Sequence, residues 1–352
     1  MHILSEPRKV ATVGRGLAAI ALAGAVLAAS GARAEIIKKE DMLRGIMITH
    51  AQCDATPQTL WLNVHGRDYC VRYYLSTVGG EGPRAVVFLQ GDQKMNLNRN
   101  TWSWIDTSEA KDVDTDDFMK IAVEFSKLAK TSAIYLSRIG LGGTSGNHTS
   151  RHTLLELHLA NAALDAIKQR HGFEGFHLAG QSGGSKLAGG LIGLRRDVAC
   201  AVLGSGPLAT PGSAKSPDPG RSFFDASENV TPLAKDRLLR PLVITDKADK
   251  RVPLAQQTGF VDKVRKAGRQ VPQFFVEASD EDHHGVLVYT EVATGGCVLG
   301  KSDEVITRAL SVIIKRNADV SERNKKEAKD KAAILAAARQ PAPEPQVAAG
   351  AK

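Results

Sequence analysis

Residues His177 to Gly190 read HLAGQSGGSKLAGG, and Ser182 stands in this stretch between glycines. The apolar run before it ends at Gly180, and Gly180 to Gly184 matches the pattern G-x-S-x-G. Such a motif needs a strand before it and a helix after it, because the serine must lie on a tight turn above a sheet edge. Glycines spare that turn steric clashes. The alternative is an ordinary serine in a glycine-rich loop, so the flanking elements distinguish the two interpretations.

Strand-like and helix-like segments alternate through most of the chain. We expect strands at 59–65, 69–76, 84–92, 132–138, 175–180, 198–206, 240–246 and 272–279, and helices at 116–130, 151–172, 182–196, 253–268 and 303–317. The first two strands form a predicted hairpin around Gly66-Arg67-Asp68. Strands that are separated by helices run parallel, with the helices on both faces of the sheet. The sequence therefore predicts an α/β fold with a mostly parallel central sheet and an antiparallel N-terminal hairpin.

The two ends of the chain differ in composition from its centre. Residues 1–34 have the pattern of a signal peptide, because Arg8, Lys9 and Arg15 precede a short apolar stretch and Ala32-Arg33-Ala34 suits a signal peptidase. We expect cleavage after Ala34 and a periplasmic or secreted protein, the alternative being an uncleaved anchor helix. Residues 35–317 form the predicted domain. Residues 318–352, rich in Lys, Ala and Pro, form a predicted flexible tail that can contact anionic surfaces.

Charge and cysteine content narrow the classes of partner and cofactor. The formal net charge is +8, but both ends are basic, so the centre lacks the clustered Lys and Arg of a nucleic-acid-binding face. In an oxidising compartment the four cysteines allow three pairings. Cys53 with Cys70 is favoured because they flank one predicted strand, and Cys200 with Cys297 then follows by elimination. No CxxC spacing occurs, and we expect no metal and no cofactor. After cleavage of the leader, no transmembrane segment is expected.

A serine hydroxyl is a weak nucleophile and needs a base to accept its proton. In sheets of this type the acid and the histidine follow the serine in that order along the chain. Asp246 and Asp249 follow one predicted strand, and His283 and His284 follow the next. Order and position at the strand ends therefore fit a serine, acid and histidine triad.

These motifs resemble the α/β-hydrolase superfamily over roughly Leu60 to Ile313. In that family the strand before the acid commonly ends in Gly-x-x-Asp-x-x-Val-Pro, and the catalytic histidine commonly precedes a glycine. Here DKADKRVP aligns Asp249 with the acid, and His284 precedes Gly285. The resemblance implies a triad of Ser182, Asp249 and His284, with Asp246 and His283 as alternates.

The same resemblance implies two backbone donors for an oxyanion. One is the N–H of Gly183, at the N-terminus of the predicted helix. The family's second donor follows a His-Gly pair, where this chain has Gln90-Gly91, so the N–H of Asp92 matches it. A carboxylate beside a developing negative charge departs from the family pattern. Arg138 is interpreted either as a contact for a substrate carboxylate or as part of a structural ion pair.

Together these residues predict an exported serine hydrolase that cleaves a small-molecule carboxylic ester through an acyl-enzyme. One alternative is a serine exopeptidase that acts on short peptides, with the carboxylates of residues 106–117 holding the substrate amine. A second alternative is a non-catalytic envelope binding protein. The loop from Asp92 to Asp117, with Trp102 and Trp104, forms either a pocket wall or an anchored surface loop, and the segment from Gly206 to Arg240 is long enough for a small lid.

Overall fold

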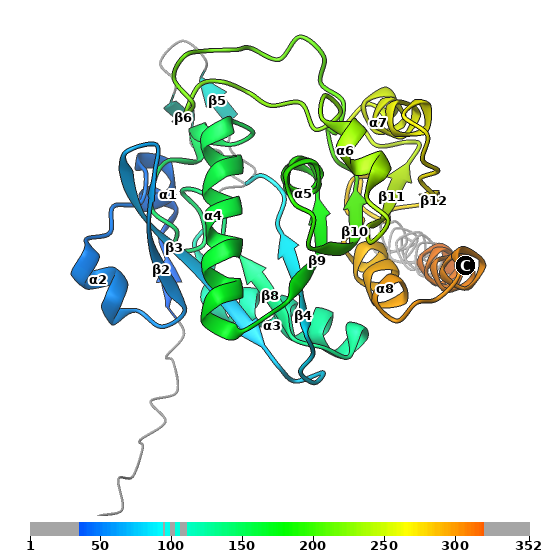
Figure 1. Ribbon diagram of the computed structural model, residues 1–352, viewed down its shortest axis with the longest axis horizontal. Coiled ribbons are helices and arrows are strands. Elements are labelled where there is room, and N and C mark those ends of the chain that lie inside the picture. The colour runs from blue at the N-terminus through cyan, green and yellow to red at the C-terminus, as the bar shows by residue number, and fades with distance from the viewer. Residues whose placement is uncertain (1–34, 94–95, 99–102, 106–110, 320–352) are drawn as a thin grey trace, which may run out of the picture. The chain divides into compact units, whose positions relative to one another are not determined.

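The computed structural model describes residues 35–319 except 94–95, 99–102 and 106–110 (Figure 1). The predicted leader, Trp102, and the tail from residue 320 lie outside the described residues. An eight-stranded sheet lies at the centre. Its spatial order is β12 (Gln273–Val276), β11 (Arg240–Asp246), β10 (Val198–Gly204), β9 (Gly175–Gln181), β4 (Arg84–Leu89), β8 (Ala133–Leu136), β3 (Arg67–Ser76) and β2 (Thr59–Val64).

Strand direction in this sheet agrees with the prediction. The strands from β12 to β8 are parallel to their neighbours, whereas β3 pairs antiparallel with both β8 and β2. The hairpin β2–β3 turns at His65 and Gly66, both at positive φ. Two short antiparallel pairs lie apart from the sheet: β1 (Ile36–Ile37) with β7 (Val113–Asp114), and β5 (Asn96–Asn98) with β6 (Ser103–Ile105). The predicted α/β fold class is confirmed.

Helices cover both faces of the sheet (Figure 1). One core contains residues of α4 (Leu154–His171), α5 (Gly183–Leu194), α6 (Val230–Lys235) and α7 (Leu254–Lys266). The opposite face is covered by α1 (Lys39–Arg44), α3 (Thr115–Ala129), α8 (Leu287–Val298) and a helix at residues 303–319. The period-2 alternation of β4 fits this arrangement, because Val87 and Leu89 belong to the first core and Val86 and Phe88 to the second. Both faces of the strand are therefore buried.

The predicted helix at 151–172 begins three residues later than expected. Thr153 is the N-cap of α4, and its side chain accepts the N–H of Glu156, while Gly172 ends the helix in the left-handed conformation. Residues His148–Ser150 form a separate 3₁₀ turn, and His152 has a φ of 62°. Residues 148–153 therefore form a 3₁₀ turn and a bend at the end of the segment that connects β8 to α4.

Helix α8 was not predicted. Its sequence, LVYTEVATGGCV, contains β-branched residues and a glycine pair, which have low helix propensity. The glycines serve packing against α3, because a Cβ on Gly295 would lie 2.8 Å from the carbonyl oxygen of Leu128. Tertiary contact therefore outweighs local propensity in this segment.

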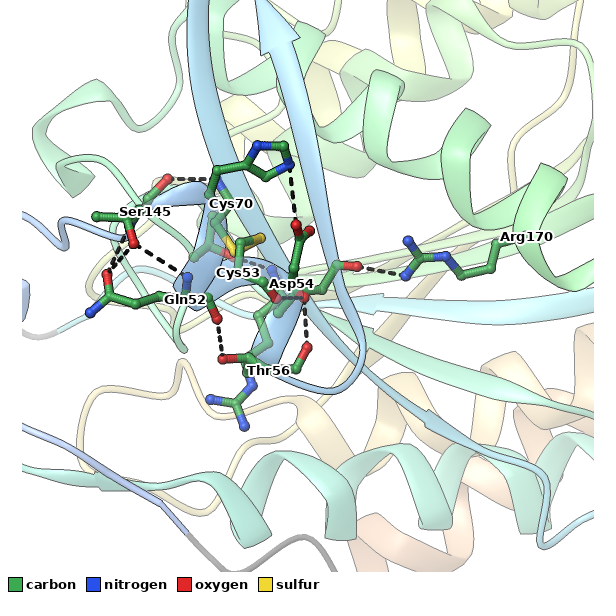
Figure 2. The surroundings of a disulfide bond; sticks show 12 residues. Gln52, Cys53, Asp54, Thr56, Cys70, Ser145 and Arg170 are labelled. Atoms are coloured by element: carbon green, nitrogen blue, oxygen red, sulfur yellow. Dashed lines mark hydrogen bonds and ion pairs between the residues drawn. A yellow bond between two sulfur atoms is a disulfide. The ribbon is translucent and has the colours of Figure 1, made fainter.

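Two disulfides join distant segments, and the pairing favoured from sequence is confirmed. Cys53 of α2 (His50–Ala55) is bonded to Cys70 of β3, as Figure 2 shows. The Ser145 hydroxyl accepts the N–H of Cys70 at 2.8 Å, so this serine has a structural contact. The second bond joins Cys200 of β10 to Cys297 of α8. Loop closure of this kind stabilises a fold by about 3 kcal/mol for a short loop and somewhat more for a long one.

None of the helices in the described ranges combines the length and the apolar composition that a membrane-spanning helix requires.

The contact between α3 and α8 brings two acidic residues together. Burial, together with a smaller contribution from the nearby carboxylate of Glu124, raises the pKa of Glu291 to about 7. An unfolded glutamate has a pKa of about 4.3, so the folded state binds a proton that the unfolded state releases between these two values. Stability contributed by this group is therefore present at low pH and is lost as pH rises toward 7.

We predict that Glu291→Gln is more stable than the native protein by about 1–2 kcal/mol at pH 8 and equal to it near pH 4. Urea denaturation at both pH values measures this difference, with the exposed Glu281→Gln as the matched control. An equal gain in the free energy of unfolding at both pH values, or no gain at pH 8, would contradict this account. It would show that ionisation of Glu291 does not destabilise the folded protein.

Candidate active site

Ser182 lies on the turn between strand β9, which ends at Gln181, and helix α5, which begins at Gly183. Its backbone has φ 54° and ψ −125°, a conformation that non-glycine residues rarely adopt. The Ser182 N–H donates to the carbonyl oxygen of Gly204 at 2.8 Å, and its own carbonyl accepts the N–H of Lys186 at 3.2 Å. Both conditions set by the motif, a strand before the serine and a helix after it, are met.

The glycines around Ser182 are required by close backbone packing. A Cβ on Gly180 would lie 2.5 Å from the carbonyl oxygen of Gly184, and one on Gly184 would lie 2.1 Å from that of Leu89. A Cβ on Gly91 would lie 3.2 Å from the Cβ of Ser182. The turn is thus pressed against the end of β4, which brings the residues after β4 beside the serine.

Asp249 and His284 form a buried acid–imidazole pair. Nδ1 of His284 lies 3.0 Å and 3.1 Å from the two carboxylate oxygens of Asp249. The carboxylate also accepts the N–H groups of Arg251 and Val252 at 2.9 Å each, which fixes its orientation. The Asp249 side chain is 1% exposed and that of His284 11% exposed. A carboxylate at Nδ1 favours the tautomer in which Nε2 is free to accept a proton.

The loop that carries His284 is held close to the serine turn. The side-chain amide of Gln181 donates to the carbonyl oxygen of His284 at 3.3 Å. Asp280 accepts the N–H groups of Gly285 and His284; burial opposes ionisation of this carboxyl, but these two donors hold its pKa below the ordinary value. Between described residues no hydrogen bond joins the Ser182 hydroxyl to His284, so that contact stays a prediction.

The two alternates from sequence, Asp246 and His283, pair with each other. Oδ2 of Asp246 lies 3.2 Å from Nδ1 of His283 and accepts the N–H of Ala278 at 2.7 Å, and Oδ1 accepts the N–H of Ala248. Asp246 therefore ties the end of β11 to the segment after β12. The His283 side chain is 40% exposed, in contrast to that of its neighbour His284.

The residues matched to the oxyanion donors also lie together. Gly183 opens helix α5, and a Cβ on it would lie 2.1 Å from Oδ1 of Asp92 and 2.7 Å from Nε2 of His152. Arg138 Nη1 donates to Oδ1 of Asp92 at 2.8 Å, and Nε of Arg151 lies 3.1 Å from Oδ2. Burial would raise the pKa of the Asp92 carboxyl, but His152 and Arg138 outweigh it and hold that pKa well below the ordinary value. The carboxylate is thus ionised and neutralised by its neighbours.

Arg138 is the centre of this charged cluster. Its side chain is fully buried, and it donates through Nε and Nη2 to both oxygens of Glu156 and through Nη1 to the carbonyl oxygen of Gln90 at 3.1 Å. Burial would raise the pKa of Glu156, but the guanidinium holds it below the ordinary value. Of the two interpretations of Arg138, the structural ion pair is the one that the geometry supports.

Three further residues near the serine were not found from sequence: Arg151, His152 and Lys186. Lys186 lies one turn into α5, where burial lowers its pKa to about 8, and its ammonium donates to Oγ1 of Thr210 at 2.9 Å. A single lysine among the small and apolar residues of α5 was an available signal. Arg151 and His152 lie in the connection before α4, where no local pattern marks them.

The segment between Gly206 and Arg240, which is long enough for a small lid, contacts the start of α4. Phe223 pairs with Thr153, and the N–H of Phe224 donates to the carbonyl oxygen of His152 at 3.1 Å. Trp104 lies in β6. Its predicted role in a pocket wall stays a prediction. Among the described residues, no group of three or more His, Cys, Asp or Glu side chains is placed to hold a metal ion.

Comparison with protein-family models finds no match, and neither does comparison with curated protein sequences. Solved structures do match. An esterase from Pyrococcus furiosus is 13% identical, with 72% of this chain and 96% of that chain covered and a TM-score of 0.50. An esterase from Butyrivibrio proteoclasticus with bound ferulic acid is 12% identical, with coverages of 69% and 98% and a TM-score of 0.47. An acylaminoacyl peptidase from Pyrococcus horikoshii is 12% identical, with coverages of 68% and 40% and a TM-score of 0.44.

At these identities the likeness concerns the fold alone. Sheet order, strand direction, the helices on both faces and the serine turn after β9 agree with it. The chain has the α/β-hydrolase fold, as its motifs predicted.

The buried cluster around Arg138 yields a prediction on stability. Arg138→Met leaves Asp92 and Glu156 buried without their guanidinium, which costs about 3–5 kcal/mol at pH 7. The pKa values of both carboxyls are held low in the native protein, so this stabilisation is present at neutral pH and is lost as pH falls. In the variant both groups protonate more readily, and the deficit should shrink near pH 4.

Urea denaturation at pH 7 and pH 4 measures this deficit. The control is Arg221→Met, because Arg221 forms only an exposed pair with Asp218 and should change stability by less than about 0.5 kcal/mol. A deficit for Arg138→Met as small as that of the control, or one independent of pH, would contradict the account of the cluster.

Proposed function

We propose that this protein is an exported serine hydrolase that cleaves a carboxylic ester through an acyl-enzyme on Ser182. One observation carries the proposal. A serine in a strained turn and a buried Asp249–His284 pair both follow the carboxyl ends of strands in the parallel part of one sheet. Working residues in such sheets gather at that edge. The fold shared with an esterase of known structure agrees with this assignment.

The proposed chemistry follows from these positions. The hydroxyl oxygen of Ser182 attacks the ester carbonyl carbon while its proton passes to Nε2 of His284, and Asp249 stabilises the imidazolium through Nδ1–H. The carbonyl oxygen becomes an oxyanion that accepts the N–H groups of Gly183 and Asp92. The intermediate then collapses and the alcohol leaves with the proton from His284. Water then attacks the acyl carbonyl carbon while its proton passes to His284. His284 returns that proton to the oxygen of Ser182 as the acyl group leaves as the acid.

The carboxylate of Asp92 does not prevent this step. Arg138 and Arg151 contact its two oxygens, so the charge next to the oxyanion site is balanced. The same contacts hold the backbone after β4 in place, since Arg138 also binds the carbonyl oxygen of Gln90. This chain therefore differs from the family's His-Gly pattern by an added carboxylate, and two arginine side chains compensate its charge.

A small-molecule ester is favoured over a peptide as substrate. An exopeptidase would use carboxylates of the 106–117 segment to hold a substrate amine, and residues 106–110 lie outside the described residues. Three of the four described carboxylates have other partners: Asp112 binds Lys38 and the N–H of Lys39, Asp114 caps α3, and Asp117 binds Lys120. These contacts support the esterase interpretation.

We further propose that export leaves a mature chain that begins at Glu35, with residues 35–317 as the catalytic domain and 318–352 as the tail. The N–H of Glu35 donates to Oγ1 of Thr115 at 3.0 Å, and its carbonyl accepts the Thr115 N–H, so this residue is already attached to the domain. Two disulfides fit an oxidising compartment such as the periplasm or the exterior. A non-catalytic binding role would not explain the buried pair of Asp249 and His284.

The assignment of Asp249 as the triad acid can be tested against Asp246 as a control. Asp249→Asn should lower kcat for a p-nitrophenyl acyl ester by about 10⁴-fold, because the imidazole loses the partner that sets its tautomer. Asp246→Asn, which alters the buried aspartate at the end of the preceding strand β11, should lower kcat by less than about tenfold.

Rates are compared with those on aminoacyl-anilides, and circular dichroism checks that both variants fold. Faster turnover of the anilides would replace the esterase by the peptidase. Equal losses for the two variants, or a large loss for Asp246→Asn alone, would contradict the assignment of Asp249.

A further inference from the structure

His152 occupies a backbone conformation that is unfavourable for its residue type. Its φ of 62° lies in the left-handed region, where non-glycine residues are uncommon. Two contacts hold it there: its N–H donates to Oε2 of Glu156 at 2.6 Å, and its carbonyl oxygen accepts the N–H of Phe224. Glu156 is in turn held by Arg138. The fold therefore fixes His152 firmly in a strained position, as is common at functional sites.

This position places the imidazole beside the residue that follows the nucleophile. A Cβ on Gly183 would lie 2.7 Å from Nε2 of His152, so only a glycine leaves room for the ring. The N–H of that same glycine is the first proposed oxyanion donor. The ring therefore lies beside the residue whose N–H is proposed to bind the substrate carbonyl oxygen.

Nε2 of His152 is buried and lies 3.2 Å from Oδ2 of Asp92, and it forms no hydrogen bond with a described residue. Asp92 also contacts Arg138 and Arg151. In the tautomer that carries its proton on Nε2, the ring presents an N–H donor.

We propose that His152 is a third donor of the oxyanion site, acting with the N–H groups of Gly183 and Asp92. The inference rests on the proposed function. When the Ser182 oxygen bonds to the carbonyl carbon, the π electron pair moves to the carbonyl oxygen, and Nε2–H of His152 donates a hydrogen bond to it. His152 neither gains nor loses a proton, because the Ser182 proton passes to His284.

The test compares His152→Leu, which removes the donor, with His152→Gln, which retains one. The ester hydrolysis assay gives kcat and KM separately. Loss of one oxyanion donor lowers kcat by about 100-fold, and KM should change by less than about threefold because the bond forms in the transition state. His152→Gln should recover at least about tenfold of the lost kcat. His158→Leu, which changes a half-buried histidine of the following helix α4, is the control and should match the native protein.

The outcomes separate this inference from the proposed function. No ester hydrolysis by the native protein would overturn both. Native hydrolysis with an unchanged kcat in His152→Leu would overturn only the role of His152. Equal losses in the Leu and Gln variants, with lowered thermal stability in both, would show that His152 serves only as a charge partner of Asp92.

Discussion

The close packing of the β9–α5 turn against the end of β4 is the constraint on which the site depends. Gly184 touches the carbonyl groups of Leu89 and Gln90, and Gly180 touches the backbone of Gly184. A side chain at either position would push the turn away, and Ser182 would lose its positive-φ conformation. The turn also lies next to Asp92, because a Cβ on Gly183 would lie 2.1 Å from Oδ1 of that carboxylate. The serine turn and the residues after β4 are therefore positioned by a single contact.

Charge around the serine is arranged in two separate groups. On one side, Asp249 and His284 form a pair that is isolated from the neighbouring pair of Asp246 and His283. On the other side, Arg138 balances the carboxylates of Asp92 and Glu156 in a buried cluster. In the proposed mechanism the first group serves proton transfer, whereas the second holds an anion beside the proposed oxyanion site. Desolvation makes both groups sensitive to the loss of a single partner.

Much of the fold and part of the site could be predicted from the sequence, because both follow from local patterns. Alternating strand and helix signals predicted the sheet, and residues at strand ends predicted the serine turn and the pairing of Asp249 with His284. Helix α8 was missed because its glycines and β-branched residues favour a helix only when packed on α3. The surroundings of Asp92 were missed because Arg151 and His152 lie about 60 residues away, in a connection with no periodic pattern. Contacts between distant loops depend on the assembled fold rather than on neighbouring residues.

The central claim, that Ser182 is an activated nucleophile, is tested most directly by covalent labelling. The folded protein is incubated with a fluorophosphonate, digested, and mapped by mass spectrometry. We predict one adduct, on Ser182, which is lost in Ser182→Ala and kept in Ser185→Ala, a change of the buried serine three residues along the chain. An unlabelled native protein, or an adduct on another residue, would contradict the claim.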